Sequence, residues 1–99
     1  MANNNWTAAD EQDVRYSVMI FMQGVLDDVM DGNMPIEDEG WRLPAQMLGY
    51  FDGSGYNTDP ALLQHVLQQL VTEGQLQKEG SMYCMPQAAW SAHPNHMPT

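Results

Sequence analysis

Apolar side chains recur with a helical period over the stretch that follows Thr7 and runs to Met30. At about 100° per residue, most of them fall on one broad face, which Met19 and Met30 widen: Val14, Val18, Phe21, Met22, Val25, Leu26 and Val29. Thr7 and Asp10 have the spacing of a capping box, in which each side chain accepts from the other residue's backbone amide. The pattern predicts a long N-terminal helix that supports the core and ends at the turn formers of residues 31 to 35.

Two apolar residues of this helix fall outside its apolar face. Tyr16 and Ile20 are four residues apart and lie beside Gln23 and Asp27. A helix of a lone globular domain normally presents polar groups at such positions. We therefore interpret Tyr16 and Ile20 as a candidate contact patch.

Shorter elements are expected in the middle of the chain. Residues 41 to 43 suit a short strand, and Pro44 opens a brief helix that carries Met47, Leu48, Tyr50 and Phe51. A third helix is predicted to start at Thr58-Asp59-Pro60, with Thr58 as the cap, and to end at Gly74. Its apolar side consists of Leu62, Leu63, Val66, Leu67, Leu70 and Val71, and its polar side of Ala61, Gln64, His65, Gln68, Gln69 and Thr72.

The period then changes from about 3.6 to 2. Residues 75 to 78 and 81 to 85 alternate around a turn at Glu79-Gly80, which predicts a hairpin. From residue 87 the composition turns to Ala, Pro, Asn, Ser and His, with one isolated Trp90. We expect one domain over residues 1 to 86 and a flexible tail over residues 87 to 99. The fold class is mainly α with a small β-hairpin.

The segment from Leu43 to Pro86 resembles the winged helix-turn-helix family. The resemblance is carried by Leu70-Val71-Thr72-Glu73-Gly74-Gln75-Leu76, followed by Gly80, Tyr83 and Pro86. In that family the recognition helix ends in a similar glycine turn, and the wing returns to an aromatic residue. The resemblance implies a winged helix preceded by a long N-terminal helix, and a role in binding DNA or docking onto protein.

The charge of the chain separates these two roles. Thirteen acidic residues face only Arg15, Arg42 and Lys78, which gives a formal net charge of −10 and an isoelectric point near 4.2. Binding to nucleic acid draws on Lys and Arg that release counterions from phosphates, and anionic membranes also attract cations. From residue 58 to residue 85 the only cation is Lys78. The charge therefore favours a protein partner, and direct binding to nucleic acid or membrane is not expected.

Two further polar surfaces are candidates for binding. Gln64, His65 and Gln68 could form a protein-binding surface or pair with adenine edges, although an ordinary solvated helix face has the same composition. The acidic residues Asp27, Glu37, Asp38 and Glu39 could enter a basic groove on a nucleic-acid-binding enzyme, although charge runs are commonly just solvated.

Chemistry at a catalytic or metal site is not indicated. Cys84 is the only cysteine, so an intrachain disulfide is impossible, and its mid-strand position offers no cation to activate a thiolate. Asp27, Asp28 and Asp31 lack the spacing of an EF-hand loop, and the His93 and His96 pair lacks further ligands. We expect no enzyme activity, no metal and no cofactor. The residues before Thr7 show no signal-peptide pattern, so a cytoplasmic location is expected.

These patterns leave three hypotheses open. The first is a protein-binding regulator or inhibitor, such as an acidic phage or mobile-element protein that occupies the basic groove of a nucleic-acid-processing complex. The second is a winged-helix regulator that binds DNA as a dimer and pools Arg15, Arg42 and Lys78 from two chains. The third is a structural adaptor in a larger assembly.

Overall fold

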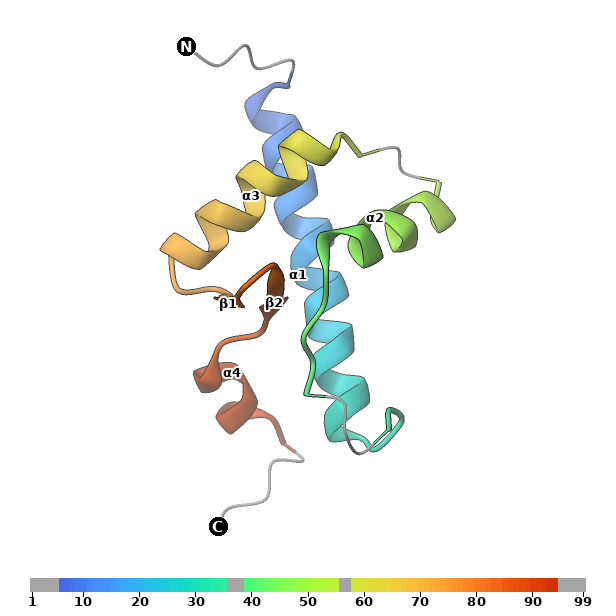
Figure 1. The fold of residues 1–99 in the computed structure, drawn as a ribbon, viewed down its shortest axis with the longest axis vertical. Coiled ribbons are helices and arrows are strands. Elements are labelled where there is room, and N and C mark those ends of the chain that lie inside the picture. Colours follow the sequence, from blue (N-terminus) through green and yellow to red (C-terminus); the bar gives the residue numbers. More distant parts are fainter. Residues whose placement is uncertain (1–5, 36–38, 56–57, 95–99) are drawn as a thin grey trace.

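The computed structural model describes residues 6–35, 39–55 and 58–94. Within them the order of elements is α1 (Ala8–Met30), α2 (Pro44–Gly53), α3 (Pro60–Thr72), β1 (Gln77–Glu79), β2 (Met82–Cys84) and α4 (Gln87–Ala92). The long α1 runs the length of the molecule, with α3 crossing its N-terminal half and α2 beside it (Figure 1). The predicted class, mainly α with a small hairpin, is confirmed. No helix in these ranges is both long and apolar enough to cross a membrane.

The start of α1 is the capping box that the sequence predicts. Thr7 Oγ1 accepts from the Asp10 amide at 3.1 Å, and Asp10 Oδ2 accepts from the Thr7 amide at 2.9 Å. At the start of α3 the cap is Asp59 and not the expected Thr58, because Asp59 Oδ1 accepts from the Ala61 amide at 2.8 Å. Pro60 therefore occupies a first-turn position, where its missing N–H leaves no bond unmade.

One hydrophobic core joins α1, α2, α3 and the hairpin. Val18 and Met22 of α1 are fully buried, and α3 contributes Val66 and Leu67 while α2 contributes Met47. The predicted apolar faces of α1 and α3 are therefore the faces that pack. Burial of large aliphatic side chains contributes roughly 1.5–3 kcal/mol each before the entropy of folding is counted, so this contact is the principal source of stability.

The hairpin forms with its turn one residue later than expected. Glu79 pairs with Met82, so the two-residue loop is Gly80-Ser81 instead of Glu79-Gly80. Gly80 adopts φ +62°, a conformation that glycine tolerates at the first position of such a loop. Of the strand expected at residues 41 to 43, only an antiparallel bridge forms: Arg42 and Tyr83 exchange two backbone hydrogen bonds of 2.8 Å each.

The flexible tail expected over residues 87 to 99 is not what residues 87–92 form, because they make up the short helix α4, and residues 95 to 99 lie outside the described residues. Trp90 anchors this helix: its ring packs against the core, and its Nε1 donates to the Met85 carbonyl at 3.0 Å. Gly40 makes the close approach possible, since a Cβ there would lie 2.6 Å from Trp90 Cζ2. His93 follows α4 and contacts Asp27 of α1 at 3.0 Å. Trp90 and Ala89, together with the His93–Asp27 contact, thus hold a segment whose other side chains are small or polar.

Two glycines, one at the end of α3 and one inside α1, test how backbone conformation affects stability. Gly74 has φ +79° and Gly24 lies within α1, and a Cβ on either would meet nothing within 4 Å. We expect Gly74→Ala to lower the free energy of unfolding by about 1–2 kcal/mol, because the left-handed conformation strains a Cβ. Gly24→Ala should raise it by about 0.5–1 kcal/mol.

Urea unfolding of both variants and the wild type checks the pair. Since steric clash is absent at either site, a loss of stability in Gly24→Ala would show that the helix interior is not as described.

Candidate interaction surface

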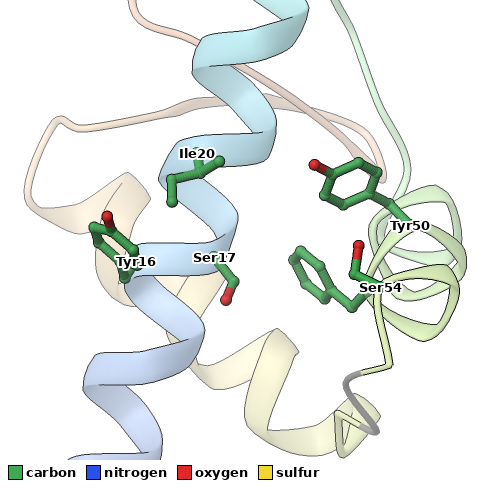
Figure 2. Close-up of a pocket in the computed structure, with 6 residues that line it drawn as sticks. Tyr16, Ser17, Ile20, Tyr50 and Ser54 are labelled. Carbon is green, nitrogen blue, oxygen red and sulfur yellow. The ribbon is translucent and has the colours of Figure 1, made fainter.

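An apolar cleft opens between α1 and α2. Its lining consists of Tyr16, Ser17 and Ile20 of α1, Tyr50 and Phe51 of α2, and Ser54 directly after α2. Figure 2 shows Tyr16, Ser17 and Ile20 along α1, with Tyr50 and Ser54 across from them. In Figure 2 the Ser17 side chain is directed toward Tyr50 and Ser54, and the Tyr16 ring lies at the edge of α1 away from Tyr50. The cleft has a volume of about 150 Å³ and no charged residue in its lining.

Contacts between aromatic rings fix the position of α2 relative to α1 at the cleft. The Phe21 ring lies 5.1 Å from that of Tyr50 and 6.4 Å from that of Phe51, and Tyr50 and Phe51 meet edge to face at 6.0 Å. Phe51 is only 2% exposed, so it belongs to the core as well as to the cleft. A shared core residue makes the cleft a fixed part of the fold, because moving α2 would disturb the packing beneath it.

The predicted exposure of Tyr16 and Ile20 is confirmed, at 68% and 48% of their surfaces. Tyr50, at 50% exposed, joins them although the sequence had placed it with the apolar residues of its helix. Tyr50 sits beside the buried Phe51, and adjacent helical residues point about 100° apart. Adjacent helical residues can nevertheless both be buried, as Val66 and Leu67 of α3 are, so the helical period alone does not separate Tyr50 from Phe51. We call Tyr16, Ile20 and Tyr50 the apolar patch.

The polar side of α3 is largely engaged within the molecule. Gln64 Nε2 donates to the Tyr83 hydroxyl at 2.9 Å. His65 Nε2 lies 2.5 Å from Glu11 Oε1, and its ring lies 5.6 Å from that of Trp6. Gln64 and His65 therefore tie α3 to the hairpin and to α1, whereas Gln68 lies on the exposed surface. The surface expected from Gln64, His65 and Gln68 is not a row of uncommitted polar groups.

An ion pair between Arg15 and Glu73 forms a second polar contact between α1 and the end of α3. Arg15 donates to both carboxylate oxygens of Glu73, at 3.0 and 2.6 Å, and also approaches Gln69 at 3.5 Å. The hydrogen bond from Arg15 lowers the pKa of Glu73, and the same bond raises the pKa of Arg15. The two-pronged geometry fixes the guanidinium more firmly than a single contact would.

The other two cations also have intramolecular contacts. Lys78 Nζ lies 5.9 Å from the centre of the Tyr83 ring, and Arg42 Nη1 donates to the Trp41 carbonyl at 2.9 Å. With Arg15 committed to Glu73, the three Lys and Arg side chains form no basic strip along α3.

The acidic candidates are only partly described. Asp27 accepts from Gln23 Nε2 at 3.1 Å and contacts His93, so it helps to hold the segment after α4 as well as adding charge. Glu39 is exposed, and Glu37 and Asp38 lie outside the described residues. Among the described residues no His, Cys, Asp and Glu side chains group as a metal site would require.

Cys84 is buried, and burial raises the pKa of its thiol. Its Sγ donates to the Glu39 carbonyl at 3.5 Å, whereas His65 contacts Glu11 and Trp6. The thiolate is therefore disfavoured at this position.

Comparison with family models, with curated proteins and with solved structures gives no match to this chain.

The Arg15–Glu73 pair predicts a pH dependence. A carboxyl whose pKa is lowered by folding stabilises above its unfolded pKa, and this stabilisation is lost as the pH falls through the folded value. We expect Glu73→Gln to be less stable than the wild type near neutral pH. The difference should shrink as the pH falls below the ordinary Glu pKa of 4.5.

Thermal unfolding from about pH 7 to about pH 3 measures this difference. Glu79→Gln is the control, because it removes the same charge from an exposed position on the hairpin and reports the change in overall repulsion. A Glu73→Gln deficit that stays constant over the whole range would contradict the role of the ion pair.

Because Tyr16 and Ile20 of the apolar patch are exposed, we expect that they contribute little to the stability of the fold. Replacing Tyr16 and Ile20 together with Ser should change the free energy of unfolding by no more than about 0.5 kcal/mol per site, because both are largely exposed. Met22→Ala, on the buried side of the same helix, should cost about 2–5 kcal/mol. Denaturant unfolding compares the two. A large loss in the Tyr16 and Ile20 variant would assign these residues to the core.

Proposed function

We propose that this chain is a non-catalytic regulator that works by binding a protein through the apolar patch. The observation that carries the proposal is the cleft between α1 and α2, whose lining includes three large exposed side chains, Tyr16, Ile20 and Tyr50. Exposed apolar groups that gather in one place, and do not scatter over the surface, are typical of protein-binding sites. Tyr is also among the residues that dominate binding energy at such sites.

A winged-helix architecture is part of this proposal. It is supported by the order of the elements and by the Arg42–Tyr83 bridge, which joins the segment before α2 to the hairpin. In this interpretation α3 is the recognition helix and β1–β2 is the wing.

The contacts of the cations favour protein over DNA as the partner. Arg15 is committed to Glu73, Arg42 Nη1 donates to the Trp41 carbonyl, and Lys78 Nζ lies over the Tyr83 ring. A DNA-binding dimer would have to free Arg15 from its carboxylate and overcome a net charge of −10 on each chain. The same charge supports a narrower form of the proposal, in which the chain is an inhibitor of phage or mobile-element type that occupies the basic groove of a nucleic-acid-processing complex.

A gel-shift titration separates protein binding from DNA binding. At low salt we expect no shift of mixed-sequence duplex DNA up to roughly 50 µM protein, because the counterion release that drives such binding requires available cations. A reference winged-helix DNA-binding protein in the same gel is the positive control. A salt-sensitive shift at micromolar protein would overturn the proposal.

Partner capture then tests the apolar patch itself. A bacterial lysate is passed over the wild type, over Tyr16→Ser with Ile20→Ser, and over Leu43→Ser with Met82→Ser. The last variant removes exposed apolar groups outside the cleft, at 39% and 40% exposure. A protein retained by the wild type and the control but lost from the patch variant is then purified and bound in isolation. Equal loss from both double variants would contradict a specific role for the patch.

A further inference from the structure

The apolar patch lies on a stripe of α1 that has a carboxylate near each end. Asp13, Tyr16, Ile20, Gln23 and Asp27 are spaced by three and four residues in alternation, so they lie along one side of the helix. At 1.5 Å per residue the stripe from Asp13 to Asp27 is about 21 Å long. Its apolar centre, Tyr16 and Ile20, borders the cleft.

No Lys or Arg side chain lies on the stripe, and the His93 ring contacts Asp27 at one end of it. The lining of the cleft contains no cation, and Arg15 extends to Glu73 on the side of α1 that meets α3. Arg42 Nη1 donates to the Trp41 carbonyl, and Lys78 Nζ lies over the ring of the hairpin residue Tyr83. The potential over the stripe is therefore set by its carboxylates and by the net charge of −10.

This charge argues against a second copy of the chain as the occupant. Pairing two clefts would bring two stripes of like charge together, and Asp13 and Asp27 on each would face carboxylates in either direction of approach. Like charges placed opposite each other suppress an association that apolar contact alone would permit. An occupant with cations at the matching positions would gain from the same field.

We infer that the cleft binds a basic amphipathic helix of a partner protein, with apolar side chains at its centre and Lys or Arg toward its ends. This inference rests on the proposed function and gives the chemistry of its partner. A groove between two helices suits a helix that inserts residues at i, i+3 or i+4, and i+7. A volume of about 150 Å³ is close to that of an engineered cavity that accepts benzene. One large side chain, aromatic or leucine, therefore enters the cleft as the anchor.

Fluorescence anisotropy with designed peptides tests the inference. The probe is a labelled peptide of about 18 residues, enough helix to cover the ~21 Å stripe, with Leu and Phe on one face and Lys toward both ends. Two reference peptides have the same composition in scrambled order and the same pattern with Glu in place of Lys. We expect the basic amphipathic peptide to bind at least about tenfold more tightly than either reference at about 50 mM salt.

Matched variants locate the binding. Tyr16→Ser with Ile20→Ser should weaken the peptide by about tenfold or more, since central aromatic anchors dominate such contacts. Asp13→Asn should weaken it by about twofold to threefold at low salt, the size of an exposed charge contact. Glu79→Gln, with the same loss of charge on the hairpin, should leave the affinity unchanged.

Four results would overturn the inference. Equal affinity for the scrambled peptide would show that charge alone attracts it, and equal weakening by Glu79→Gln would show that the attraction is not local to the stripe. A dimer of the wild type that Tyr16→Ser with Ile20→Ser dissociates, seen by analytical ultracentrifugation, would show that a second copy covers the cleft. If instead lysate capture yields a protein lost with the patch and only the peptides fail, the proposed function stands and the partner chemistry is wrong.

Discussion

The burial of one face of α1 is the contact on which the other elements depend. Val18 and Met22 are fully buried on this face, α3 crosses it, and α2 approaches it from the side (Figure 1). Because α2 meets α1 through Phe21, Tyr50 and Phe51, the two helices are held by ring contacts of 5.1 to 6.4 Å. The cleft is the space left where α2 ends its contact with α1. The candidate binding surface is therefore a by-product of how the core is closed, and it cannot move independently of the core.

Polar contacts between α1 and α3 fix the orientation of α3 on the apolar face of α1. Glu11 binds His65 near the start of α1, and Arg15 binds Glu73 one helical turn further on. Both pairs are partly exposed, so each adds little net stability. Their larger effect is geometric, because two fixed contacts along one crossing restrict how α3 can rotate or slide. The same contacts occupy side chains that a nucleic-acid-binding winged helix would direct outward.

Local signals in the sequence predicted the elements, and long-range contacts decided what the sequence could not. The capping box at Thr7, the left-handed Gly74 and the change of period before the hairpin all act within a few residues, so they can be recognised in the sequence. The exposed pair Tyr16 and Ile20 followed from the helical period in the same way. By contrast, the contact between His65 and Glu11 joins residues 54 positions apart, and the ordering of α4 requires the space at Gly40. The composition of residues 87 to 92 predicted a flexible tail, because one isolated Trp90 among small and polar residues forms no periodic pattern.

The net charge of the chain opposes the self-association that the apolar patch would favour. A concave surface that exposes Tyr16, Ile20 and Tyr50 would by itself promote self-association, since apolar contact is non-directional. A net charge of −10 opposes that association, because two copies repel each other over a range of about 8–10 Å at ordinary ionic strength. The same charge repels any acidic protein and attracts a basic one. In the proposed interaction, the same charge that opposes self-association favours a basic partner.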